Sequence, residues 1–280
     1  MPTTTVNGIS MNYVDEGAGP VLLLVHGFPL DHSMWQFQIA DLKEEVRVIA
    51  PDLRGFGATG VTPGTVSMRQ MADDLAALLD ALKITEPVFF CGLSMGGYVA
   101  WQFIERHAHR LAGVILCDTR AQADTPKERE TRLETADKVL KEGPGFLADS
   151  MPKKLFSELA HKEQGALVNA TKAVIRKGNP EGVAAAARGM AARPDVRDRL
   201  PSIELPALVI VGTDDAISTA DEMREIAEAL PVSMFTEVPG AGHMSPLEAP
   251  DVVNTAILEF VQRLTMPPPE MEADEDDEES

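Results

Sequence analysis

One strand-turn-helix segment limits the possible folds of this sequence more than any other feature. The apolar run Val88–Cys91 predicts a buried strand, and residues 98–103 read as a helix. Between them stands Gly92-Leu93-Ser94-Met95-Gly96-Gly97. In a G-x-S-x-G turn of this kind the flanking glycines are needed because a Cβ would collide with the strand or the helix. The turn is sharp and strained, and it presents the Ser94 hydroxyl as a nucleophile.

The remaining sequence alternates short apolar runs with helical stretches. This pattern predicts an α/β fold with a mostly parallel central sheet and helices on both faces. After Ser67, apolar residues recur at spacings of three and four, which predicts a helix that Ser67 caps and that ends at Leu82. A last helix is expected over 250–264. The runs expected to form strands are 20–25, 46–50, 88–91, 114–117, 205–211 and 234–238.

The alternation stops between Arg120 and Leu200, where charge and helix-forming residues dominate. We therefore expect a helical insertion over 120–200, lying over the carboxyl edge of the sheet. It divides one core into two parts, 1–119 and 201–265. Residues 266–280 combine three prolines with acidic residues and lack apolar periodicity, so they are expected to be a disordered tail that serves solubility or binds a partner.

Composition restricts the partners of the chain. The net charge is −19, and eight of the 44 acidic residues lie between Glu270 and Ser280, so that the rest of the chain carries −11. An acidic body disfavours nucleic acid and anionic membranes as partners. The N-terminus shows no signal peptide, and no apolar run is long enough to span a bilayer. We expect a soluble cytoplasmic protein that acts on a small molecule, with Cys91 and Cys117 as buried thiols.

A serine nucleophile needs a base, and the base needs an orienting acid. Of the six histidines, His243 is the best candidate because it lies in a glycine-bearing loop between the last predicted strand and the last helix. His107, His109 and His161 are expected at the surface.

The orienting acid is expected at the end of a strand. The strand at 205–211 ends in Gly212-Thr213-Asp214-Asp215, and spacing alone does not choose between the two aspartates. Asp118, after the preceding strand, is a third candidate, although a role in a strand-ending turn is the stronger interpretation. No metal-ligand spacing or nucleotide-binding glycine pattern is present, so neither a metal nor a cofactor is expected.

Acyl transfer also requires donors for a developing oxyanion. The backbone N–H groups of Met95, after the nucleophile, and of Phe28, in the turn after the strand at 20–25, are the candidates. Pro29 cannot donate. The residues expected around the substrate are His26, Gly27, Trp35, Phe146 and Met151.

Together these motifs make the chain resemble an α/β-hydrolase over residues 5–265. The resemblance rests on His26-Gly27-Phe28-Pro29, Pro51-Asp52-Leu53-Arg54-Gly55-Phe56-Gly57, the Ser94 turn, Gly212-Thr213-Asp214-Asp215 and Gly242-His243. It implies Asp215 as the acid, and it implies that the insertion is a cap forming the acyl or alcohol pocket. The chain is similar to carboxylesterases and lactonases grouped with 3-oxoadipate enol-lactonase, but Gly27-Phe28-Pro29 departs from the polar oxyanion loop typical of enol-lactonases.

The expected activity is hydrolysis of a small to medium carboxylic ester or lactone through Ser94, Asp215 and His243. Two alternatives keep the same triad and cleave a carbon-carbon bond or perform perhydrolysis. A third is a ligand-binding receptor of the same fold without turnover.

Overall fold

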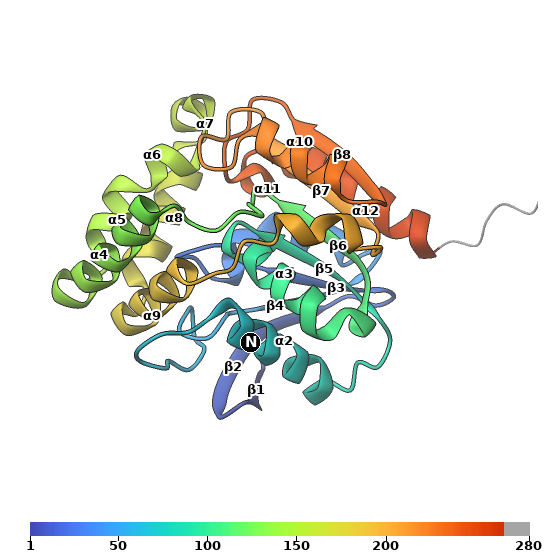
Figure 1. Cartoon of the computed structure of the whole chain (residues 1–280), viewed down its shortest axis with the longest axis horizontal. Coiled ribbons are helices and arrows are strands. Elements are labelled where there is room, and N and C mark those ends of the chain that lie inside the picture. The colour runs from blue at the N-terminus through green and yellow to red at the C-terminus, as the bar shows by residue number, and fades with distance from the viewer. Residues whose placement is uncertain (266–280) are drawn as a thin grey trace, which may run out of the picture.

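A single eight-stranded sheet organises residues 1–265, which are the residues that the computed structural model describes. Its strand order is β1-β2-β4-β3-β5-β6-β7-β8 (Figure 1). The expected tail at 266–280 lies outside the described residues. The strands are β1 (Thr3–Val6), β2 (Ile9–Glu16), β3 (Val21–Val25), β4 (Arg47–Pro51), β5 (Val88–Leu93), β6 (Leu111–Cys117), β7 (Ala207–Gly212) and β8 (Ser233–Val238).

The six strands expected from apolar runs are β3 to β8, and all of them pair in parallel. Strands β1 and β2 were not expected. They pair with each other and with β4 in antiparallel fashion. In β2, buried Ile9, Met11 and Tyr13 alternate with Ser10 and Asn12, so a half-buried strand period is present but is interrupted by the burial of Asn12.

Helices cover both faces of this sheet, as the sequence predicts. One face carries α2 (Met68–Ala81), α3 (Met95–His107) and α10 (Ala220–Ala229); the other carries α1 (Gln36–Leu42) and α12 (Pro250–Thr265), with the short α11 (Ser245–Glu248) beside them. The Ser67 hydroxyl accepts a hydrogen bond from the Gln70 amide and caps α2 as expected. None of the helices in this part of the chain has the length and apolar character required to cross a bilayer.

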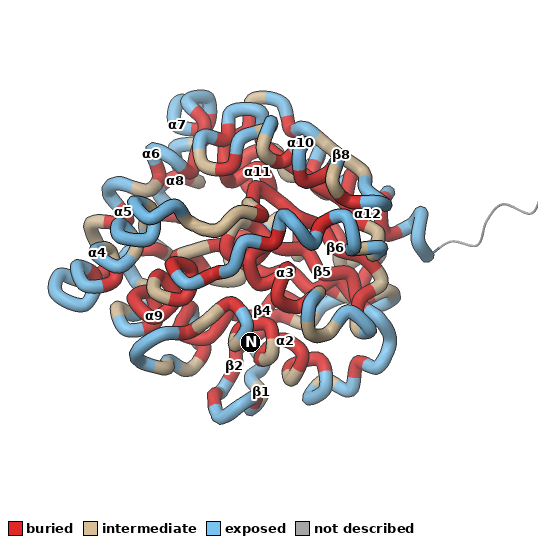
Figure 2. Tube along the Cα trace, in the orientation of Figure 1, coloured by how far each residue is buried: buried red, intermediate tan, exposed pale blue. Residues whose placement is uncertain are grey.

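Between β6 and β7 the chain forms six α-helices, one 3₁₀ helix (Arg197–Ser202) and no strand, and we call the part with the six α-helices the helical insertion. Its helices are α4 (Pro126–Glu142), α5 (Gly145–Ser150), α6 (Pro152–Leu155), α7 (Glu158–Glu163), α8 (Gly165–Lys177) and α9 (Pro180–Ala191). They form a lobe at one side of the sheet (Figure 1), and most of the outer surface of this lobe is exposed (Figure 2). At its base the Val196 amide donates to the Ala121 carbonyl at 2.9 Å, so the insertion leaves and rejoins the core at one point.

Helix α9 fixes the insertion to the core through close backbone contact. A Cβ added at Gly182 would stand 1.9 Å from the Gly55 carbonyl oxygen, and one at Gly189 would stand 1.8 Å from that of Val66. Only glycine allows this approach, because any larger residue would push the helix away.

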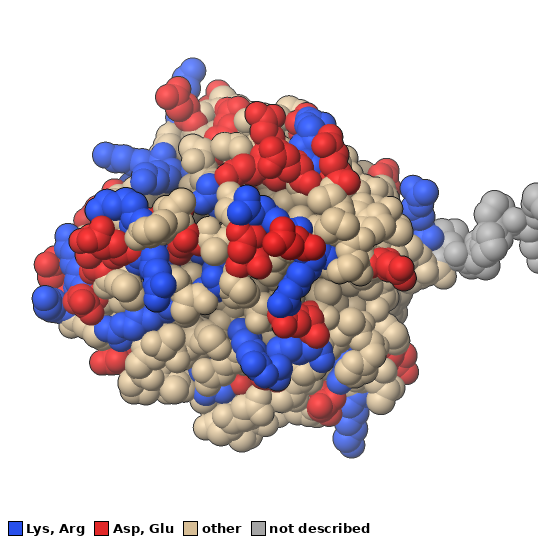
Figure 3. All heavy atoms as spheres, viewed as in Figure 1, with Lys and Arg blue, Asp and Glu red and all other residues tan. Residues whose placement is uncertain are grey.

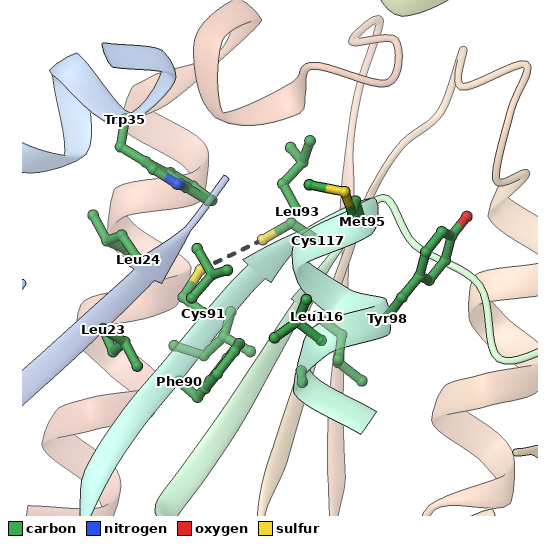
Figure 4. Packing of buried hydrophobic residues seen from close by; sticks show 14 of the residues in the cluster. Leu23, Leu24, Trp35, Phe90, Cys91, Leu93, Met95, Tyr98, Leu116 and Cys117 are labelled. Atoms are coloured by element: carbon green, nitrogen blue, oxygen red, sulfur yellow. Dashed lines mark hydrogen bonds between the residues drawn. The ribbon is translucent and has the colours of Figure 1, made fainter. Parts of the chain in front are cut away.

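The core lies between the sheet and its helices. Figure 4 shows Trp35, Leu24, Phe90 and Leu116 packed around the central strands, with the thiols of Cys91 and Cys117 facing each other. The two sulfur atoms are 3.8 Å apart, and both side chains are fully buried. The expected pair of buried thiols is therefore present on adjacent strands.

Candidate active site

The turn between β5 and α3 places Ser94 in a strained backbone conformation. Its φ of 53° and ψ of −110° lie in a region that side-chain-bearing residues rarely adopt. A Cβ at Gly92 would stand 2.4 Å from the Gly96 carbonyl carbon, and one at Gly96 would stand 2.2 Å from the Val25 carbonyl oxygen. The two glycines thus let helix α3 start against β5 and β3, and Ser94 remains partly exposed among buried neighbours.

The turn after β3 lies beside this serine. A Cβ added at Gly27 would be 3.5 Å from the Ser94 Cβ. Among residues 1–265, neither the Phe28 nor the Met95 backbone N–H donates a hydrogen bond to a protein acceptor. Backbone N–H groups without a protein acceptor can donate to an oxyanion.

His243 and Asp215 form a buried pair at the same edge of the sheet. His243 Nδ1 lies 2.8 Å from Asp215 Oδ2, and the two side chains are 3% and 0% exposed. Because Nδ1 must donate to the carboxylate, Nε2 of the neutral ring is left as an acceptor. Asp214 is exposed and accepts from the Thr213 hydroxyl instead. The structure therefore brings Asp215, and not Asp214, to His243.

Four hydrogen bonds hold the Asp215 carboxylate. The Ile217 amide donates to Oδ1 at 2.7 Å and the Ser218 amide at 3.1 Å, while the Ser218 hydroxyl and His243 approach Oδ2. Burial alone would raise the pKa of Asp215, but His243 and these donors outweigh it and hold the pKa below its usual range. Asp215 is therefore anionic at neutral pH.

Asp118, the third candidate for the orienting acid, binds the ends of two strands instead of the histidine. Its carboxyl oxygens accept from the Gly212 amide at 2.8 Å and from the Ser245 hydroxyl, and it does not contact His243 in the described chain. It joins the end of β6 to the end of β7 and to the segment after His243. Burial, and then the Asp215 charge, raise the pKa of Asp118 well above its usual range.

A cavity of about 530 Å³ lies between Phe28 and the helical insertion; Phe28 is the lining residue that the core supplies, and Ser94, Met95 and His243 are not among the residues that line it. Phe146 and Met151, two of the expected substrate contacts, line it together with Phe28. Charged side chains of both signs cover the outside of the insertion (Figure 3). Those on the cavity wall are mostly paired elsewhere: Lys127 with Glu130, Glu128 with Arg120, and Arg132 with Asp124.

Trp35 and His26, two of the residues expected around the substrate, do not line this cavity. Both side chains are fully buried. The Trp35 ring packs near Leu24 in the core (Figure 4). His26 Nε2 accepts from the Leu53 amide at 2.9 Å, and Nδ1 donates to the Gly27 carbonyl at 2.9 Å. Burial lowers the pKa of His26, so a neutral ring joins the turn after β3 to the loop after β4.

Other histidines face carboxylates or carbonyls away from Ser94. His107 contacts Asp73, and His161 contacts the Pro152 carbonyl. Asp31, His32 and Asp52 form a group whose ligand atoms lie within 4.8 Å of one another. Each Asp52 oxygen already accepts two hydrogen bonds, from the amide and ring of His32 and from Asn12 and Ala58. That carboxylate is used to hold the loop after β4, and its lone pairs are occupied.

Known proteins share this fold. Residues 22–256 match the family described as the alpha/beta hydrolase family. A thermophilic esterase from Thermogutta terrifontis, solved with malate bound, is 47% identical, with a TM-score of 0.91 over 94% of this chain and 97% of that chain. The enol-lactonase from Burkholderia xenovorans LB400 is 32% identical, with a TM-score of 0.87 over 93% of this chain and 100% of that chain.

A curated relative agrees with these structures. The chain is 30% identical to 3-oxoadipate enol-lactonase 2 of Acinetobacter baylyi, over 93% of this chain and 96% of the relative. The family match spans all the elements that carry Ser94, Asp215 and His243. The resemblance seen in the sequence is confirmed, and this chain belongs to the alpha/beta hydrolase family.

Proposed function

We propose that this protein is a serine hydrolase that cleaves a small to medium carboxylic ester or lactone through an acyl-enzyme at Ser94. The observation that carries the proposal is the strained Ser94 beside two backbone N–H groups without protein acceptors, at the sheet edge that also holds the His243–Asp215 pair. The esterase and enol-lactonase relatives support the same reaction class.

In the proposed reaction His243 Nε2 takes the proton from the Ser94 hydroxyl as its oxygen attacks the substrate carbonyl. The Phe28 and Met95 amides donate to the oxyanion that forms. Asp215, kept anionic by its donors, stabilises the imidazolium. The leaving alcohol receives the proton from His243. Water then attacks the acyl-enzyme and gives a proton to His243, which returns it to the Ser94 oxygen as the acid is released.

The helical insertion is the proposed cap over this reaction. Phe146 and Met151 line the cavity from the insertion, and Phe28 lines it from the core. Most charged groups on the wall are neutralised by ion pairs, which favours an uncharged group of the substrate at this place. The proposed domains are therefore a core of 1–119 and 201–265 with the cap at 120–200.

Hydrolysis of p-nitrophenyl acetate, butyrate and octanoate by the wild type and by Ser94→Ala tests the proposal. We expect turnover by the wild type, a loss of at least about 10³-fold in Ser94→Ala, and a chain-length profile set by the cavity. Turnover that is equal in the two proteins contradicts the serine mechanism. Labelling of Ser94 without steady-state turnover would indicate a receptor, and product analysis separates hydrolysis from carbon-carbon cleavage or perhydrolysis.

A further inference from the structure

The loop that carries His243 is held by the helical insertion on both sides of the histidine. The Met244 amide donates to the Leu155 carbonyl at 3.1 Å. On the other side, a Cβ added at Gly242 would stand 2.6 Å from the Ser157 nitrogen and 3.0 Å from the Phe156 carbonyl carbon. Residues 155–157, which join α6 to α7, therefore pack directly against the backbone of the proposed general base.

One buried carboxylate completes this contact. Glu248 Oε1 accepts from the Gly242 amide at 3.1 Å, and Oε2 accepts from the Ser157 amide at 3.1 Å. Glu248 is only 8% exposed, and its own carbonyl accepts from the Gln164 side chain at 2.9 Å. Each oxygen thus binds a backbone N–H of a different part of the chain, one in the core loop and one in the insertion.

We infer that Glu248 is a positioning residue that ties the His243 loop to residues 156–157 of the insertion and so fixes the general base. The inference rests on the proposed function, because it assigns to His243 the role of base. Asp215 orients the imidazole ring, but it does not fix the loop backbone, which contains two glycines, Gly240 and Gly242. Charge-assisted bonds to backbone amides are strong enough to do so.

The insertion therefore has a second task besides forming a pocket. Its α6–α7 junction supports the histidine from outside the core. A displacement of a catalytic group by 1 Å can cost about 10²-fold in rate. Loss of the Glu248 bridge should then lower kcat while substrate binding in the cavity at Phe146 and Met151 stays the same.

Glu248→Gln tests this inference, with Glu259→Gln as the matched control on an exposed site of α12. The amide keeps the size of the side chain, but its NH₂ group faces one of the two backbone donors, so one bond is lost. With p-nitrophenyl butyrate we expect kcat to fall by about 10- to 100-fold and KM to change by less than about 2-fold. Hydrogen exchange should accelerate together in peptides covering 155–158 and 241–245.

The outcomes are distinguishable. A kcat equal to that of the control, with or without a lower Tm, overturns the positioning role and leaves Glu248 a purely structural group. A wild type without turnover above Ser94→Ala refutes the proposed function, and unchanged exchange in both peptides then refutes the bridge itself. If Glu248→Gln does not fold, hydrogen exchange of the wild type tests the bridge instead. The peptides covering 155–158 and 241–245 should then open with the same free energy, and unequal opening free energies contradict the bridge.

Discussion

The backbone strain at Ser94, the proposed nucleophile, should lower the free energy of unfolding by a measurable amount. At φ 53° and ψ −110° a residue with a Cβ costs about 1–3 kcal/mol, which glycine avoids. Glycine in turn loses about 0.4–1 kcal/mol through the entropy of the unfolded chain. Ser94→Gly should therefore stabilise the fold by about 0.5–2 kcal/mol.

Ser94→Ala is the matched comparison because it removes the same hydroxyl but keeps the Cβ and the strain. Urea unfolding followed by circular dichroism gives the free energy of unfolding for both variants, and Tm should differ by roughly 1–3 °C for a chain of this size. Both variants should be inactive. A glycine variant no more stable than the alanine variant would refute the argument that the turn is strained.

Three further predictions follow from buried groups and from the cavity. The pKa of Asp118 is raised in the folded state, so this residue lowers the free energy of unfolding increasingly as the pH rises above about 4. Asp118→Asn should therefore raise Tm at pH 8 more than at pH 4, and an equal change in Tm at the two pH values would contradict the raised pKa. The Asp52 hydrogen bond raises the pKa of His32. The stabilisation that this bond gives the folded protein is complete below about pH 6.5 and is lost as the pH rises through the folded pKa of His32. The difference in Tm between the wild type and His32→Gln should therefore narrow between pH 6 and 9, and a constant difference would contradict this reasoning. Phe146→Ala should raise KM for octanoate esters by about 10-fold but not for acetate, in a steady-state series; equal changes for both would place Phe146 away from the acyl group.

Hydrophobic pattern and turn chemistry account for the part of the fold that could be predicted from the sequence. Strands β3 to β7 are fully or largely apolar because helices cover them. The edge strand β8 is only half apolar, and of its residues only Val238 is buried. Strand β2 gives a different signal from these runs, because Ile9, Met11 and Tyr13 alternate with Ser10 and Asn12. Asn12 is nevertheless buried, where it donates to Asp52.

The site was predictable where chemistry is local and unpredictable where it depends on packing. The Ser94 turn and its glycines form one local motif, so their sequence specifies their geometry. The choice between Asp214 and Asp215 depends on which side chain the turn after β7 directs inward, and spacing does not show this. Trp35 and His26 are near the site in sequence, but packing directs them into the core. The bridge made by Glu248 could not be predicted, because one of its two partners, Ser157, lies 91 residues away in the sequence.

The single closing point of the insertion, where Val196 meets Ala121, separates two tasks in the chain. No strand of the described sheet lies between these residues, so we expect that the insertion can be exchanged as a module while the sheet edge is retained. A graft between relatives with junctions at 121 and 196 should carry substrate preference with it, provided that the graft also supplies the backbone amide that Glu248 binds and glycines at 182 and 189.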